Sequence, residues 1–331
     1  MDCYTDEWRR TAPDLVVYLP SGPEESDSEN QHFLVVATPR RTFLAFWTQA
    51  TRENAPDQRC VVSRSEDRGH SWSQPVEIGG PGEDGRIASW GFPIVVPHSG
   101  RVYYFYNKNV GVEDVREDTT GECWYRWSDD DGRTWSGEHG IVQIRPGAIS
   151  HPDPGVPPSW ICYQTPILTP GGDVLAGFTR WASRAVGGDV GLFELDSEIW
   201  FLRFEDILTA DEPLALRVTI WPEGDRGLRV PRPDDPTASV AQEPSVQPLP
   251  DGRLICAMRT LTGSIWFALS DDDGRSWDDP RPLRYCPGGP EVLQPIAPCP
   301  LYRLRDGRYL LLFHNNDGTA HGGQGPGDYR L

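Results

Sequence analysis

The sequence has no excess of basic residues. Its 31 Lys and Arg face 49 Asp and Glu, which gives a formal net charge of −18 at pH 7. Nucleic acids and anionic membrane surfaces are bound through basic patches, so this balance argues against both as partners. A small anionic ligand is still allowed, because a local arginine cluster holds one against the net field. No apolar run reaches the length needed to span a membrane.

The sequence also lacks the usual signs of disulfides, metals, cofactors and export. Its seven Cys are an odd number without a Cys-x-x-Cys pair, which indicates scattered core thiols. Its seven His show no metal-ligand spacing, and we expect neither a metal nor a cofactor. The start, Met1–Trp8, has no basic region followed by an apolar one, as a signal peptide would. These features predict a soluble, reduced, cytoplasmic protein.

No long stretch carries the 3.6-residue periodicity of an amphipathic helix. Instead, short apolar runs alternate with Asp-Gly, Gly-Gly and Ser-Gly pairs, and the chain holds 34 Gly and 32 Pro. Short apolar runs punctuated in this way are typical of β-hairpins. We therefore expect an all-β fold, with residues 1–331 forming one domain.

One short pattern, Ser-x-Asp-x-Gly-x-x-Trp, occurs three times: at Ser65–Trp72, Ser128–Trp135 and Ser270–Trp277. The second interval is about twice the first, which indicates a repeat of roughly 60–75 residues with one copy lost. In each copy the Asp and Ser side chains bond to their own turn and Gly takes the positive φ. The Trp anchors the turn, and we expect Trp72, Trp135 and Trp277 to be buried at equivalent positions. We interpret these boxes as purely structural.

The boxes resemble the Asp boxes of the sialidase superfamily, also called BNR repeats. The resemblance implies a six-bladed β-propeller. Five hairpins accompany the boxes, each read as the inner strands of one blade: 33–47, 92–106, 165–179, 244–258 and 297–313. In the third blade we expect the lost box near Ser197–Trp200. Because no outer strands follow the fifth hairpin, we expect about five blades and an incomplete C-terminus.

The inner strands of a blade are antiparallel, so residues before the first and after the second share one rim. These rim positions mix aromatics, amides, arginines and a glutamate, as a sugar pocket requires. They are Gln31, His32, Thr48, Gln49, Trp90, Asn107, Lys108, Trp160, Gln164, Arg180, Trp181, Gln242, Glu243, Arg259, Gln294, His314 and Asn315.

The fourth blade, from Gln242-Glu243-Pro to Met-Arg259, is similar to a sialidase active-site segment. The resemblance implies that Glu243 polarises a nucleophilic Tyr and that Arg259 grips a substrate carboxylate. It also implies an Asp acid/base in a loop of the first blade, where Asp57 lies, and we take Arg180 as a second carboxylate ligand. The alternatives are a hairpin-end salt bridge for Glu243 and Arg259, a solvated Asp57, and a blade-surface role for Arg180.

The chain departs from the sialidase pattern at the start of the first blade, where Gln31-His32-Phe33 replaces Arg-Ile-Pro. The resemblance implies a nucleophilic Tyr and a third Arg, which we expect beyond residue 331, because Tyr104 and Tyr106 lie in the second blade and are expected to pack. The leading hypothesis is a sialidase-like exo-glycosidase that removes terminal acidic sugars from glycans. Trp90, Gln164 and His314 complete its substrate-binding candidates. The alternatives are a polysaccharide lyase or other glycosidase, and a non-catalytic carbohydrate-binding propeller.

Overall fold

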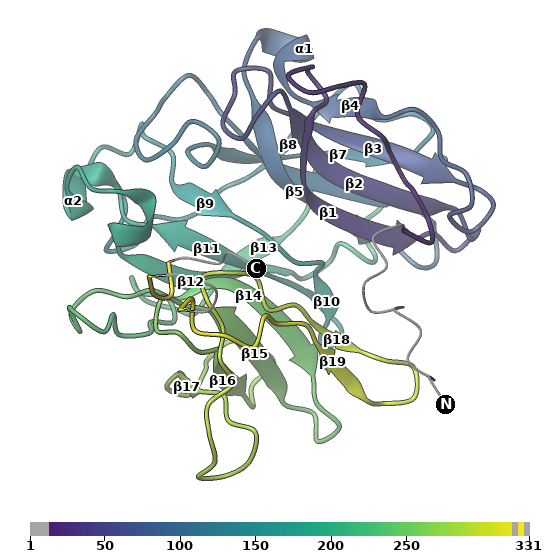
Figure 1. Ribbon diagram of the computed structural model, residues 1–331. Helices are drawn as coiled ribbons and strands as arrows, with labels where there is room; N and C mark the ends of the chain where they lie inside the picture. The colour runs from purple at the N-terminus through teal and green to yellow at the C-terminus, as the bar shows by residue number, and fades with distance from the viewer. Residues whose placement is uncertain (1–12, 320–323, 328–331) are drawn as a thin grey trace, which may run out of the picture.

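The computed structural model describes residues 13–319 and 324–327. Its strands form successive sheets arranged as the blades of a propeller (Figure 1). The first blade contains β1 (Glu29–Ala37), β2 (Phe43–Ala50), β3 (Arg59–Ser65) and β4 (Val76–Gly79). The second contains β5 (Ala88–Val95), β6 (Val102–Lys108), β7 (Glu122–Ser128) and β8 (Gly140–Val142). Within both blades the strands pair in chain order and antiparallel.

The third blade has a divided inner strand. Both β9 (Ser159–Ile161) and β10 (Ile167–Leu168) pair with β11 (Val174–Trp181), which is followed by β12 (Ser197–Phe204) and β13 (Val218–Trp221). The fourth blade contains β14 (Gln242–Pro248), β15 (Leu254–Arg259), β16 (Trp266–Ser270) and β17 (Arg281–Pro282). A last sheet has two strands, β18 (Leu301–Arg303) and β19 (Tyr309–Leu311).

Helix is almost absent from the described residues: α1 (Pro81–Asp84), α2 (Arg184–Gly187) and the 3-10 turn η2 (Leu192–Glu194) are each one turn long. None of the described helices is long and apolar enough to cross a membrane. The turn at α1 is held by Lys108, whose ammonium is fully buried. It donates to Asp84 Oδ1 and to the carbonyls of Gly80 and Arg86, at 2.7, 3.2 and 2.7 Å.

The five predicted hairpins are confirmed, and each forms the first two strands of a sheet or, in the third blade, β10 and β11. The expected place of the lost box was wrong. The intact boxes begin on the last residue of a third strand, as at Ser65 and Ser128. In the third blade that strand is β12, so the equivalent position is Phe204, whereas Ser197 opens the strand.

The three boxes share one hydrogen-bonding pattern. In the second, Ser128 Oγ donates to Asp130 Oδ1 at 2.8 Å, and Asp130 accepts from the backbone and hydroxyl of Thr134. Gly132 has φ 73° and donates to Ser128 Oγ. The Trp residues, predicted to be buried, are half-buried. Two of them lie in a joint between blades: Trp135 packs edge-on against Phe46 at 5.9 Å, and Trp277 stacks on Phe201 at 4.7 Å, in each case on the preceding blade. Trp72 packs against β2 and β3 of its own blade.

The second and third boxes also bind their blade to the one before it. In the second box the carbonyl of Asp131 accepts from Arg64 Nε of β3 at 2.7 Å. In the third, the carbonyl and carboxylate of Asp273 accept from Arg203 of β12 at 2.6 and 2.8 Å. Arg203 also pairs with Asp173 of its own blade. Each of these two boxes therefore joins two blades as well as shaping its own turn.

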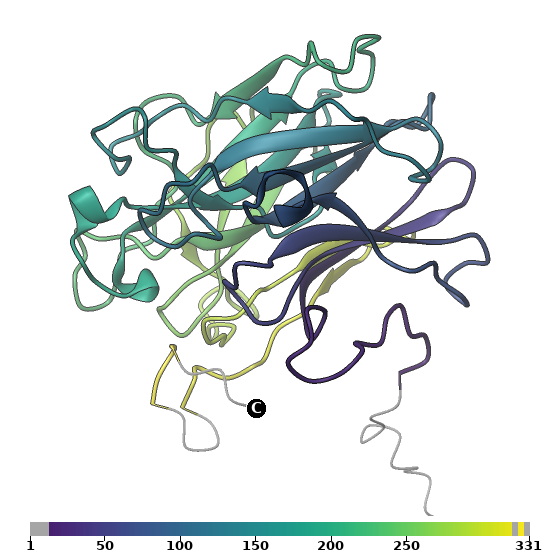
Figure 2. The same cartoon turned by 90° about the horizontal axis from the view of Figure 1, so that it is seen from above.

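The described sheets leave apolar residues open on one side of the ring. Both views place β18–β19 on the same side of the molecule as β1 (Figures 1 and 2). Phe33 and Val35 of β1 are exposed, as are Tyr302 and Leu310 of the last sheet. Four complete blades and a two-stranded sheet support the β-propeller, while the six-bladed count and the single-domain organisation stay predictions.

Candidate functional site

The same backbone irregularity occurs in the innermost strand of three blades. In β1, His32 and Phe33 together oppose a single residue of β2, which is a β-bulge. The bulge recurs in β5 at Trp90 and in β14 at Glu243. The first bulge residue has positive φ each time: 58°, 55° and 44° for His32, Trp90 and Glu243. Bulky residues rarely adopt this conformation, and it concentrates at functional sites.

Hydrogen bonds from neighbouring blades hold two of these bulges. The backbone N–H of Trp90 donates to Thr48 Oγ1 of the first blade at 3.1 Å. That of Glu243 donates to Thr179 Oγ1 of the third blade at 2.7 Å. A threonine of the second strand thus supports the strained residue of the next blade.

The bulge residues converge at the propeller axis. The ring of His32 lies 5.7 Å from that of Trp90 and 5.1 Å from that of Tyr163, between centroids. Tyr163 lies in the break between β9 and β10, so a residue of the first blade contacts one of the third. Contacts that pass over a whole blade are possible only near the axis. His32, Trp90, Tyr163, Glu243 and Arg259 are called the axial cluster below.

Glu243 and Arg259 form a buried ion pair. Arg259 Nη1 bonds to Glu243 Oε1, and Arg259 Nη2 donates to Gln242 Oε1 at 2.9 Å. Their side chains are only 4% and 11% exposed. Among the described residues, neither Glu243 Oε2 nor Arg259 Nε has a hydrogen-bonding partner, although both atoms are buried. The pair therefore keeps one acceptor and one donor unused.

Burial governs the proton affinities within the axial cluster. It raises the pKa of Glu243, and Arg259 partly opposes the rise. It raises the pKa of Tyr163 to about 12, helped by the Glu243 carboxylate and opposed by Arg259. It lowers the pKa of His32 to about 4, with the Tyr163 backbone acting in the opposite direction. At neutral pH the cluster therefore holds a neutral imidazole and a neutral phenol beside the pair of Glu243 and Arg259.

The segment between β11 and β12, which contains α2 and η2, extends over one side of the axial cluster. It is fixed by Asp114, which accepts from Ser183 Oγ and from the backbone of Arg184, both at 3.1 Å. Its 3-10 turn η2 carries Phe193, whose ring centroid lies 5.8 Å from Arg259 Cζ. Phe193 is 44% exposed, so an aromatic face borders the ion pair from the solvent side.

The sequence matches the BNR repeat-like domain over residues 41–321, most of the chain. The chain belongs to the BNR repeat-like domain family. The resemblance of its boxes to those of the sialidase superfamily is thereby confirmed. No curated protein matches the sequence.

Several solved structures share the fold of this BNR repeat-like chain. The Hadza microbial sialidase Hz136 has a TM-score of 0.59 at 16% identity, with 87% of this chain and 53% of that chain covered. The NanB sialidase of Streptococcus pneumoniae has 0.57 at 12%, with 92% and 60% covered. The α-L-arabinanase of Penicillium chrysogenum has 0.50 at 17%, with 92% and 77% covered. The chain thus spans about half of Hz136 and three fifths of NanB.

Arg180, predicted as a carboxylate ligand, lies in a joint of the BNR propeller. Its guanidinium is fully buried 5.0 Å from the ring of Trp200 and donates to the carbonyl of Arg145. Burial lowers the pKa of Arg180 to about 10, and Arg145 adds to this while Glu198 opposes it. Its described contacts are with this joint, and none is with Glu243 or Arg259.

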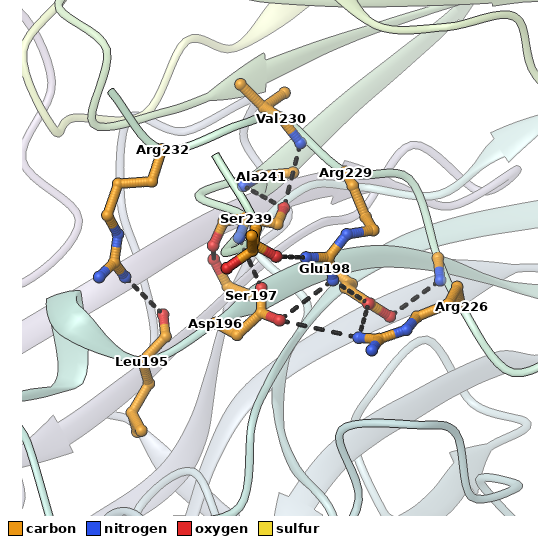
Figure 3. Close-up of polar contacts among 12 residues, drawn as sticks. Leu195, Asp196, Ser197, Glu198, Arg226, Arg229, Val230, Arg232, Ser239 and Ala241 are labelled. Carbon is orange, nitrogen blue, oxygen red and sulfur yellow. Dashed lines mark hydrogen bonds and ion pairs between the residues drawn. The ribbon is translucent and has the colours of Figure 1, made fainter. Parts of the chain in front are cut away.

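A second charged network fastens the chain between β13 and β14 against β12. Figure 3 shows Glu198 between Arg226 and Arg229, which it binds at 2.9 and 2.6 Å. Glu198 also accepts from the backbone of Gly227 and from Trp200 Nε1. Its carboxylate is fully buried and its oxygens are all engaged, so this network reads as structural.

The remaining predicted site residues have local contacts. Asp57 accepts from the backbone and hydroxyl of Thr51, the latter at 2.6 Å, and so closes its own loop. His314 donates its backbone N–H to Gln294 Oε1 at 2.8 Å. The carbonyl of Gln164 accepts from Cys162 Sγ at 3.6 Å. The catalytic role of Asp57 and the binding roles of Gln164 and His314 stay predictions.

Tyr163 is the axial residue that the sequence did not reveal. The positions before the third hairpin predict Trp160 and Gln164 at the rim, and Tyr163 is not among them. The break between β9 and β10 brings Tyr163 inward instead. The only signal was the pair Thr165-Pro166, since proline disfavours regular strand pairing. Among the described residues, no group of three or more His, Cys, Asp or Glu could hold a metal ion.

Proposed function

We propose that this chain is a glycoside hydrolase that binds its sugar at the axial cluster. The observation that carries the proposal is the buried ion pair of Glu243 and Arg259, held by a strained bulge with Glu243 Oε2 unused. Strained backbone and a carboxyl of raised pKa are features of catalytic sites. The named relatives of the same fold, two sialidases and an arabinanase, support a glycosidase.

Glu243 is the proposed proton-transfer group. A carboxyl whose pKa is raised towards the working pH exchanges protons efficiently, and burial acts on Glu243 in that direction. Arg259 holds the carboxylate in place and limits the shift. The half-exposed ring of Phe193 supplies an apolar face for a sugar ring, while a contact of the sugar with the buried Trp90 stays a prediction.

Tyr163 is the proposed nucleophile: its oxygen bonds to the anomeric carbon as the glycosidic bond breaks, the leaving oxygen takes up a proton, and water then releases the sugar from Tyr163. Tyrosine nucleophiles are a recognised exception to the two-carboxylate scheme of glycosidases. With a pKa of about 12, its phenol is a poor nucleophile unless a base takes the proton during attack. Glu243, whose charge acts on this phenol, is the base that we propose.

The finer prediction from the sequence, removal of a terminal acidic sugar, has Arg259 as its support. A lyase or a non-catalytic carbohydrate-binding propeller remain the competing functions. The three differ in product: a hydrolase releases a reducing sugar, a lyase leaves an unsaturated uronate, and a binding protein leaves the glycan intact.

The test is a turnover screen of the purified chain on aryl glycosides and oligosaccharides, read by released sugar and by ultraviolet absorbance. For a substrate that is cleaved, Glu243→Gln should lower kcat at least about a hundredfold, the usual size of general acid–base catalysis. The matched control is Glu212→Gln, at an exposed residue. Unchanged kcat in Glu243→Gln, or an unsaturated product, would refute the proposal.

A further inference from the structure

We infer that the axial cluster takes an uncharged sugar, bound through its hydroxyl groups and a ring face, in preference to a carboxylate sugar. This inference names the substrate class of the proposed glycosidase and rests on that function. The guanidinium that would bind a substrate carboxylate is that of Arg259, which belongs to the buried ion pair.

The fork of Arg259 is already occupied within the protein. Nη1 bonds to Glu243 and Nη2 to Gln242, so both terminal nitrogens have protein acceptors. A carboxylate ligand binds arginine best through two parallel hydrogen bonds from this fork. Along the other edge of the guanidinium, at the unused Nε and one terminal nitrogen, a carboxylate would share Arg259 with Glu243 and bring a like charge next to it. To bind at the two terminal nitrogens, it would have to displace Glu243, whose buried negative charge would then face the negative ligand. Breaking a buried ion pair in this way is strongly unfavourable.

The described residues bring no second positive charge to the cluster. His32 is neutral there, since burial lowers its pKa to about 4. Arg180 is turned into the joint beside Trp200, and its donated hydrogen bond goes to Arg145. The opposite charges of the ion pair of Glu243 and Arg259 therefore cancel, and the cluster offers no net positive charge to an anion. The net charge of −18 adds a field that repels anions.

The unused polar atoms of the cluster fit hydroxyl groups. Glu243 Oε2 needs a donor, whereas Arg259 Nε and Trp90 Nε1 need acceptors. A sugar hydroxyl both donates and accepts, but a carboxylate only accepts and would leave Oε2 opposed by a like charge. The ring of Trp90 is buried against Tyr163, so the half-exposed ring of Phe193 beside Arg259 is the face offered to a sugar ring. The chemistry of the site thus matches a neutral sugar.

Binding of matched pairs that differ by one carboxylate tests the inference. We would measure Kd by calorimetry or saturation-transfer NMR for methyl glycosides of galactose and galacturonic acid, and of glucose and glucuronic acid. Methyl arabinofuranoside and N-acetylneuraminic acid complete the panel. At least one neutral sugar should bind, and its carboxylate partner or N-acetylneuraminic acid at least tenfold more weakly.

Glu243→Gln supplies the internal check. The amide keeps an acceptor but removes the charge and weakens the hold on Arg259, so the preference for the neutral sugar should shrink at least fivefold. Glu212→Gln should leave the ratio unchanged. Tighter binding of a uronic acid or of N-acetylneuraminic acid by the unaltered chain overturns the inference and leaves a glycosidase possible. Neutral binding without hydrolysis of any glycoside overturns the proposed function alone, and no sugar binding overturns both.

Discussion

His32 makes the stability of the fold depend on pH in a window of its own. Burial lowers the pKa of its imidazole from 6.5 to about 4, so between these values the unfolded chain binds a proton that the folded chain does not. Stability rises with pH wherever the unfolded state binds more protons. The contribution of His32 to the free energy of unfolding should therefore be fully present above about pH 6.5. It should be lost progressively as the pH drops towards 4.

The size of the loss follows from the shift. A pKa difference of about 2.5 units corresponds to about 3 kcal/mol at 1.36 kcal/mol per unit. The carboxyl of Asp67 titrates lower, with a pKa of about 2, so its contribution disappears mainly below this window. Glu243 has the opposite sign, because a raised carboxyl pKa favours the folded state as the pH falls. A comparison between variants removes that shared background.

The assay is urea unfolding followed by tryptophan fluorescence at pH 7, 6, 5 and 4.5. His32→Asn removes the titration and suits the site, because Asn tolerates positive φ better than most residues. The unaltered chain should lose about 2 kcal/mol more than His32→Asn between pH 7 and 4.5, most of the full effect. His98→Asn, at an exposed turn, is the control and should follow the unaltered chain. If the free energy of unfolding fell equally between pH 7 and 4.5 in His32→Asn and in the unaltered chain, the reasoning would be refuted.

Three further predictions concern the joints and the open side of the ring. Arg203→Ala should lower the free energy of unfolding in urea by about 3 kcal/mol, because Asp273 and Asp173 lose their buried partner. The control Arg217→Ala, at an exposed residue, should lower it by less than about 1 kcal/mol. Equal losses would contradict the role of Arg203 in joining the blades. Trp277→Ala should lower the free energy of unfolding by about 2 to 3 kcal/mol, a small loss for a large aromatic because the ring is only half-buried. An unchanged free energy of unfolding would show that the stacking of Trp277 on Phe201 does not stabilise the fold. The apolar residues exposed on β1 and β18–β19 predict self-association in sedimentation velocity, which a monodisperse chain at high concentration would contradict.

The sequence was most informative where local chemistry repeats. Each box sets its own turn through Ser, Asp and Gly, so three copies were enough to predict the blades. The rim argument placed His32, Trp90 and Glu243 on one face, because antiparallel pairing alone decides which strand ends meet.

The rest depends on contacts between blades, which a single sequence does not encode locally. Arg180 occupies a rim position, but its guanidinium packs against the ring of Trp200 in the neighbouring joint between blades. Tyr163 reaches the axis through a break in pairing that has no strong local signal. The ion pair of Arg203 and Asp273 joins residues 70 positions apart, and neither segment carries a local sequence pattern that predicts it.

The turn at α1 has a practical consequence for chemistry on this molecule. Lys108 is the only lysine in the sequence, and its ammonium is enclosed by Asp84 and two carbonyls. The surface therefore carries no side-chain amine, so acylating dyes, amine cross-linkers and lysine-directed enzymes find no reactive side chain on the folded protein. Among the described cysteines Cys286 alone is exposed. A thiol-directed probe placed there would report on the fourth blade and leave the axial cluster unmodified.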